Sequence, residues 1–482
     1  MGRSSSGRDV STAAHSAART VAPDGTDRER RVTELPLFFW LFIAGMAANI
    51  FSGHSDELGL PISPDRFLLP AAMVLAVLDD KAGPPLRNRM VYWGLGVFAA
   101  VATWSALGHG VMQDSVAAFA LLDRVLLPTA LFIVAPRLLA TTLRRTVFLW
   151  LLTLVGAYLA VTSVGQTLNV SALVWPPYAR DLTDGPLGSG APTGVHRAGG
   201  PFLAAEANGI ALVMCAFAAA ALTSATRSLR QAFAAVVAIS CLAASLLTMT
   251  RSVWASGLLA IVIVSWSTPA IRRRWPLLLI AAVAAVGAIL LMGMNDVLLQ
   301  RATQVSSVYD RIATNDAALR IMAERPLDGV GWRQFVDSGW DWVRQGDTHP
   351  LAHTHIEVHN VFLARGAELG TPAALLFVLC VLNGPLAAVV RPTSPDLSAW
   401  QPMALGIFVV WLVPSLLSPN PYPFPNFVMW TVTGLLLPSR LATPAARARR
   451  LHSQDASATA PSDEETVHPA AEGEQEEARH GR

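Results

Sequence analysis

The sequence predicts an all-α, polytopic membrane protein with about twelve transmembrane helices. Hydrophobic residues make up 52% of the 482 residues, whereas charged residues make up only 15%. The mean hydropathy is +0.43. Apolar runs long enough to cross a bilayer recur along the chain. Because lipid offers the backbone no hydrogen-bond partners, runs of this length are expected to be helices.

Twelve segments meet the requirement of about 20 apolar residues for a membrane-spanning helix. The second and fourth are the least apolar, because they carry Arg66 and the pair Asp123-Arg124, and the last is short. The twelve lie near residues 35–53, 60–79, 91–108, 117–136, 146–165, 203–222, 232–249, 252–268, 276–294, 360–382, 400–418 and 426–438.

Polar segments flank this transmembrane domain, which we place at residues 35–438. Residues 1–34 are rich in Ser, Ala and Arg and lack the apolar core of a signal peptide, and residues 439–482 are rich in Ala, Glu and Arg. Both compositions predict disordered tails. The three cysteines lie inside apolar runs without metal-type spacing, which is typical of small core residues.

The basic residues predict the orientation of the chain. Connecting segments that would face the cytoplasm are positive, whereas the short outer turns lack Lys and Arg, except for Arg251 between the seventh and eighth helices. We therefore expect both termini in the cytoplasm. The inward positive residues are Arg28, Arg30, Arg31, Lys81, Arg87, Arg89, Arg137, Arg144, Arg145, Arg227, Arg230, Arg272, Arg273, Arg274, Arg391, Arg447, Arg449 and Arg450.

Two long segments remain on the outer side, at about residues 166–202 and 295–358. The second separates the ninth and tenth helices and is the larger extracytoplasmic loop. It contains an amphipathic stretch from Val308 to Glu324 that predicts a helix, followed by a glycine turn and a Trp/His-rich run. Long loops with aromatic residues are usually ordered and functional. We expect an ordered extracytoplasmic cap.

Four arginines on the predicted outer side are candidates for binding substrate. Arg197 precedes the sixth helix, Arg251 lies in the turn between the seventh and eighth, and Arg311 and Arg320 lie in the amphipathic stretch of the large loop. Guanidinium groups stay charged and bind phosphate oxygens through two parallel hydrogen bonds, so this set suits a pyrophosphate. The alternative is that Arg311 and Arg320 pair with loop acids, such as Asp310, Asp316 and Glu324.

Histidines concentrate just before the tenth helix, at His349, His353, His355 and His359. If the helix extended backwards, His355 and His359 would share a face, which is a spacing that metal sites use. The chain has no HExxH motif and no DxD-type acidic pair. We therefore expect no metal and interpret His359 as a general base or hydrogen-bond donor.

These residues resemble motifs of the O-antigen ligase and O-antigen polymerase family. His359-Asn360, nine residues and then Gly370 are similar to its His-[Asn/Ser/Gln]-X9-Gly motif. The run 324–332 resembles the loop segment before that histidine, and 368–370 resembles the continuation of the tenth helix. Arg197 with Asn208, and Thr250 with Arg251, stand where the family has other outward arginines.

The resemblance covers about residues 195–385. Both the motifs and the order of the segments along the chain agree with the family. The sequence departs from the family at Ala373 and at Ala207-Asn208, where the family has a small or polar residue and a Pro-Asn pair. These departures bear on which subfamily the sequence resembles and leave the resemblance to the family itself in place.

The resemblance implies glycan transfer from an undecaprenyl-pyrophosphate-linked donor to an acceptor hydroxyl on the extracytoplasmic face of the membrane. It implies that Arg197 and Arg251 act on the leaving pyrophosphate and that His359 activates the acceptor. Arg311, Arg320, Asn208 and Asn360 would bind substrate. Guanidinium groups can meet the developing charge, so neither a metal nor a cofactor is expected.

Two classes of function remain open at this point. One is the transferase, as a polymerase or as a ligase, acting on a glycan or lipid acceptor in polysaccharide assembly for the cell envelope. The other is a transporter or flippase for a lipid-linked or anionic substrate, with the arginines as its vestibule. A net charge of +2 gives no reason to expect nucleic acid as a partner.

Overall fold

The computed structural model describes residues 35–79, 81, 89–181, 197–226, 229–267, 306–344, 351 and 355–437. All regular elements in this part of the chain are helical, which confirms the all-α prediction. The described residues belong to one compact unit, Met1–Leu437. The expected ninth membrane helix, near 276–294, and both tails lie outside them.

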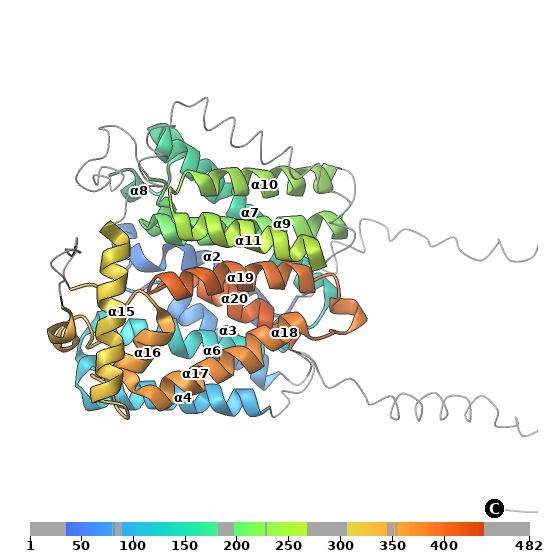
Figure 1. Cartoon of the computed structure of the whole chain (residues 1–482). Helices are drawn as coiled ribbons and strands as arrows, with labels where there is room; N and C mark the ends of the chain where they lie inside the picture. Colours follow the sequence, from blue (N-terminus) through green and yellow to red (C-terminus); the bar gives the residue numbers. More distant parts are fainter. Residues whose placement is uncertain are drawn as a thin grey trace, which may run out of the picture. The chain divides into compact units, whose positions relative to one another are not determined.

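The longer helices follow the apolar runs in order (Figure 1). They are α2 (Leu37–Ala48), α3 (Asp65–Leu78), α4 (Met90–Gly108), α5 (Ser115–Leu121), the π-helix η4 (Leu122–Leu126), α6 (Leu127–Leu138), α7 (Thr142–Thr167), α9 (Ala205–Ala225), α10 (Leu229–Leu246), α11 (Arg251–Ser267), α15 (Ser306–Glu324), α16 (Val361–Leu369), α17 (Thr371–Val381), the π-helix η9 (Leu382–Leu386), α18 (Ala387–Val390), α19 (Gln401–Leu417) and α20 (Pro423–Leu436).

Short helical turns join these helices. They are η1 (Asn49–His54), η2 (Asp56–Leu58), η3 (Val111–Gln113), η5 (Ser171–Leu173), α8 (Tyr178–Asp181), η7 (Gly200–Phe202), η8 (Ser338–Trp342) and η10 (Pro395–Leu397).

Seven helices of the described part are long and apolar enough to cross a membrane, and α11 and α19 are shorter apolar helices. The protein is therefore a multi-pass, all-helical membrane protein, whereas the total of twelve helices stays a prediction. The seven are Leu37–His54, Met90–Gly108, Ser115–Leu138, Thr142–Thr167, Ala205–Thr223, Leu229–Leu246 and Thr371–Val390.

The helix α9 lies at the centre of the bundle and packs against α7, α10, α11, α19 and α20. Small residues allow the helices to approach closely, as is common in membrane bundles. At Gly156 on α7, an added Cβ would lie 2.8 Å from Cys215 on α9 and 2.8 Å from Cys241 on α10. All three cysteines are buried as free thiols, which agrees with their expected role as small core residues.

The two ends of the bundle differ in the contacts that they make. At one end Arg137 donates to the carbonyls of Ala76 and Val77, and Arg145 pairs with Asp396 at 3.0 Å. These residues come from segments predicted to face the cytoplasm. At the other end, the predicted outer segments meet one another, and α15 runs across the ends of the bundle helices (Figure 1). The side of the membrane that each end faces remains a prediction.

The helix predicted from Val308 to Glu324 is confirmed as α15. The tenth membrane helix differs from the prediction of one continuous segment near 360–382. It breaks at Gly370 into α16 and α17, because the loop before it docks there through its backbone. Thr371 donates to the carbonyl of Pro326 at 2.7 Å, and Val330 donates to that of Ala367 at 2.8 Å.

Two glycines make this backbone contact possible. Gly329 has a φ of +62° and Gly370 a φ of +86°, and these are values that residues with a Cβ rarely adopt. A Cβ on Gly370 would also collide with the carbonyl of Leu327, and one on Gly329 would collide with that of Ala367. The glycine of the His-Asn-X9-Gly motif is therefore needed for close approach of two backbone segments.

We expect Gly370→Ala to lower the free energy of unfolding by about 2 kcal/mol or more, because it adds both strain and backbone overlap. Thermal unfolding in detergent measures this loss. Gly96→Ala in α4 is the matched control, because an added Cβ there meets nothing within 4 Å. It should leave stability unchanged or raise it slightly. Equal stability of the two variants would contradict this account of the docking.

Candidate functional site

Arg197 lies where the segment before η7 meets the turn between α10 and α11. Its Nε donates to the carbonyl of Thr248 at 3.1 Å, and its Nη2 donates to the hydroxyl of Thr250 at 2.8 Å. Thr250 directly precedes Arg251. The structure thus joins the two segments that carry the predicted catalytic arginines.

Asn208 is buried on α9 behind this junction. Its Nδ2 donates to the hydroxyl of Ser163 at 2.8 Å and to the carbonyl of Ala198 at 2.9 Å. The amide therefore holds the backbone beside Arg197. Its side chain is 0% exposed, so the bonds that it makes are bonds within the protein.

Arg311 on α15 interacts electrostatically with Glu206 and with Arg251 at this junction. Burial lowers the pKa of Arg311, the carboxylate of Glu206 raises it, and the positive charge of Arg251 lowers it further. The Nε of Arg311 is buried and has no hydrogen-bond partner among the described residues. A buried guanidinium N–H without a partner is costly, and an anionic ligand would satisfy it.

Glu206, in the first turn of α9, is a site residue that the sequence analysis did not name. It accepts a hydrogen bond from Ser252 of α11 at 2.8 Å and one from the hydroxyl of Tyr422, before α20, at 3.5 Å. Burial raises the pKa of Tyr422, and Glu206 adds to this effect. Tyr422 therefore stays neutral and acts as a donor to the carboxylate.

His359 lies directly before the start of α16. Residues 355–360 are not helical, so the tenth helix does not extend backwards and His355 and His359 do not share a helical face. His355 instead stacks on Trp340, with ring centroids 5.1 Å apart, and lies 3.0 Å from the carbonyl of Val336. The Nδ1 of His359 lies 3.5 Å from the hydroxyl of Thr314 on α15. His349 and His353 lie outside the described residues.

Asn360 is the N-cap of α16. Its Oδ1 accepts hydrogen bonds from the backbone N–H groups of Phe362 at 2.9 Å and Leu363 at 3.2 Å. Such a cap satisfies donors that the first turn of a helix cannot pair. Asn360 therefore fixes the point at which the chain leaves His359 and becomes a helix.

The two arginines of α15 lie on opposite faces of the helix. Arg311 and Thr314 are three residues apart and so share a face, whereas Arg320 is nine residues from Arg311. The Nε and Nη2 of Arg320 donate to the carbonyl of Trp342 at 3.2 and 2.9 Å. The structure thus brings Arg311 toward His359 and Arg251, while Arg320 holds the loop on the other side.

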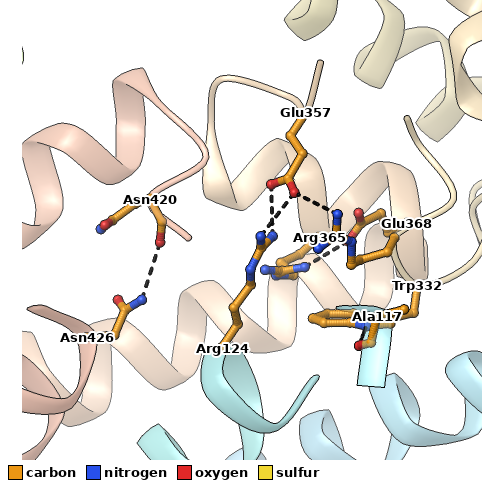
Figure 2. Close-up of polar contacts among 9 residues, drawn as sticks. Ala117, Arg124, Trp332, Glu357, Arg365, Glu368, Asn420 and Asn426 are labelled. Carbon is orange, nitrogen blue, oxygen red and sulfur yellow. Dashed lines mark hydrogen bonds and ion pairs between the residues drawn. The ribbon is translucent and has the colours of Figure 1, made fainter. Parts of the chain in front are cut away.

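A second group of charges lies next to the docked loop (Figure 2). Arg124 on η4 donates to both oxygens of Glu357 at 2.8 and 3.0 Å, and Arg333 lies 3.4 Å from the same carboxylate. Arg365 pairs with Glu368 at 2.7 Å. We call these five residues the ion cluster. Outside this cluster, Asp123 pairs with Arg66 on α3 at 3.0 Å.

The ion cluster lies beside Trp332, the last residue of the run 324–332 in the docked loop. The guanidinium of Arg365 lies 4.5 Å from the centre of the Trp332 ring system. The indole donates to the carbonyl of Ala117 on α5 at 3.3 Å, and the backbone N–H donates to Ser105 on α4 at 3.0 Å. The loop is thereby attached to two bundle helices as well as to α16 and α17.

A small cavity of about 20 Å³ adjoins the ion cluster, which is room for about one water molecule. Its lining includes Arg124, Arg365, Ser415, Asn420 and Asn426. The Oδ1 of Asn420 is buried without a hydrogen-bond partner within the described ranges. Over those ranges, no group of three or more His, Cys, Asp or Glu side chains could hold a metal ion.

The helices and their charged end define a multi-pass membrane protein with a loop docked against the bundle. Residues 233–378 match the family model described as O-antigen ligase. The match confirms, over this range, the resemblance to the O-antigen ligase family. The matched range contains Arg251, Arg311 and His359, whereas Arg197 and Glu206 precede it. No curated protein matches the chain.

The pH dependence of stability tests the ion cluster. Burial alone would raise the pKa of Glu357, but Arg124 and then Arg333 hold it below its usual value of 4.5. A lowered folded-state pKa stabilises the fold above the unfolded-state pKa, and this stabilisation is lost as the pH falls through the folded-state value.

We therefore expect the Tm of the wild type to exceed that of Glu357→Gln by the largest amount at neutral pH, where Glu357 is ionised. This difference should shrink as the pH falls from about 4.5 towards the lower folded-state pKa, because the unfolded-state carboxylate takes up its proton first. Thermal unfolding across this range measures it. A difference that stays constant down to about pH 3 would contradict the ionised pair.

Proposed function

We propose that the protein transfers a glycan from an undecaprenyl-pyrophosphate-linked donor to an acceptor hydroxyl at the end of the bundle that α15 crosses. The predicted orientation places this end on the extracytoplasmic face. The observation that carries the proposal is the position of α15, which presents Arg311 near Arg251 and Thr314 near His359. Two kinds of chemistry, anion binding and proton transfer, thus meet on one helix face.

The arginines are suited to the leaving group. As the bond between the anomeric carbon and the pyrophosphate breaks, the electron pair stays on the pyrophosphate oxygen. Arg197, Arg251 and Arg311 stabilise that developing charge, because guanidinium groups fixed in place need no reorganisation during the reaction. Arg311 is best suited to bind the leaving pyrophosphate, because its Nε is buried without a protein partner in the described part of the chain.

His359 is suited to the acceptor. A neutral imidazole accepts the proton of the acceptor hydroxyl while the oxygen forms its bond to the anomeric carbon. Direct attack inverts the configuration at that carbon. Asn360 and Thr314 hold the backbone and the ring of His359, and Asn208 holds the backbone beside Arg197, so these residues support the reacting groups.

The family match supports an O-antigen ligase-like or polymerase-like function and does not favour the transporter alternative. A ligase moves a finished glycan to a final acceptor, whereas a polymerase adds repeat units to a growing glycan. The proposed chemistry is the same for both.

Purified protein in lipid, supplied with a lipid-pyrophosphate glycan and an acceptor, should form the transferred product. His359→Ala and Arg251→Ala should lower kcat by at least about a hundredfold, because each removes a group that acts in the transition state. Arg391→Ala is the control, since this exposed residue follows α18 at the opposite end. Full activity in both site variants would overturn the assignment.

Arg311 and Arg320 should differ in their effect on anion binding. We expect Arg311→Ala to raise the Kd for inorganic pyrophosphate by about ten- to a hundredfold, the value of a charged hydrogen bond. Arg320→Ala should have a smaller effect, because its guanidinium bonds to the carbonyl of Trp342. Calorimetric titration of the folded variants measures both. A larger effect for Arg320→Ala would assign the anion to the opposite face of α15.

A further inference from the structure

Glu357 stands two residues before His359, in a segment that has no helix of its own. Its carboxylate is held by both terminal nitrogens of Arg124 (Figure 2). Arg124 belongs to the π-helix η4, which lies inside the apolar helix Ser115–Leu138. One ion pair therefore ties a membrane helix to the segment that carries His359. π-helices inserted in α-helices are frequent at functional sites.

The neighbours of His359 are fixed on either side. Val358 is 1% exposed and packs in a small core with residues of α15, including Ala318 and Ile321. Asn360 caps α16. Glu357 is bonded to Arg124 and lies near Arg333. With these anchors in place, the backbone at His359 has little freedom to shift along the bundle.

We propose that the ion pair between Arg124 and Glu357 is a positioning device for His359, which fixes the imidazole relative to the arginines of the site. This inference rests on the proposed function, because it assigns the pair a role in that reaction. Arg124 and Glu357 are positioning residues, since they act through the segment 357–360 rather than on the substrate.

The geometry of the pair favours this role over simple neutralisation of charge. A guanidinium that binds both carboxylate oxygens fixes direction as well as distance, whereas an ammonium group acts as a point charge. Lysine at position 124 would keep the charge and lose the directional contact. A displacement of about 1 Å at a reacting group can cost about a hundredfold in rate.

The test compares Glu357→Gln and Arg124→Lys in the full-length protein in lipid nanodiscs. We expect kcat for glycan transfer per folded molecule to fall about a hundredfold. KM for the donor should change by less than about threefold, because the arginines that bind the donor are unaltered. The double variant should be no worse than the worse single variant, because both residues act through one contact.

Asp123→Asn is the matched control. It breaks the neighbouring ion pair with Arg66, which is similarly buried and joins η4 to α3 rather than to the segment before His359. It should lower stability and leave kcat per folded molecule unchanged. If Glu357→Gln and Arg124→Lys also keep the wild-type kcat once corrected for folded protein, the pair is structural only and the proposal fails.

Hydrogen exchange tests the positioning without any activity. The amides of residues 358–363 should exchange at least about tenfold faster in Glu357→Gln and Arg124→Lys, and at the wild-type rate in Asp123→Asn. Unchanged protection in the first two variants would overturn the positioning role, whatever the transfer assay gives. Faster exchange in a protein whose wild type transfers no glycan would instead overturn the proposed function alone.

Discussion

The close approach of two backbone segments, 326–331 and 366–371, is the contact on which the rest of the site depends. Backbone hydrogen bonds join the segments, and Gly329 and Gly370 allow the approach. The docking divides the predicted tenth helix into α16 and α17 and brings Trp332 against α4 and α5. It therefore sets the position of the large loop and of α16, which begins two residues after His359.

Burial of charge is the second constraint. A charged side chain inside a helical membrane bundle must find a partner, because lipid and apolar side chains cannot solvate it. Arg124 finds Glu357 in the loop, and Arg365 finds Glu368 one turn further along its helix. The loop thereby supplies a counter-charge to a buried arginine of the bundle as well as covering the bundle. Arg311 differs from Arg124 and Arg365, because its buried Nε has no partner within the described residues. Arg66 also has such an Nε, but its Nη2 pairs with Asp123.

Local patterns in the sequence predicted the helices, because hydropathy needs no knowledge of distant contacts, and α15 lies where its amphipathic pattern placed it. The break at Gly370 depends on a backbone contact with a loop about 40 residues earlier, which no local pattern reveals. The partner of Arg124 is 233 residues away. Glu206 resembles an ordinary acid in the first turn of a helix. The sequence analysis grouped Arg311 with Arg320, although their nine-residue spacing places them on opposite faces of a helix.

The central claim is that an acceptor oxygen attacks the anomeric carbon while the pyrophosphate leaves intact on the arginines. A donor labelled with ¹⁸O at the oxygen that bridges the anomeric carbon and the pyrophosphate tests this claim directly. After a complete reaction, mass spectrometry of both products locates the label. The account predicts that it stays with the lipid pyrophosphate and that the transferred glycan is unlabelled. Label in the glycan product would show cleavage of the phosphorus–oxygen bond and would contradict the account.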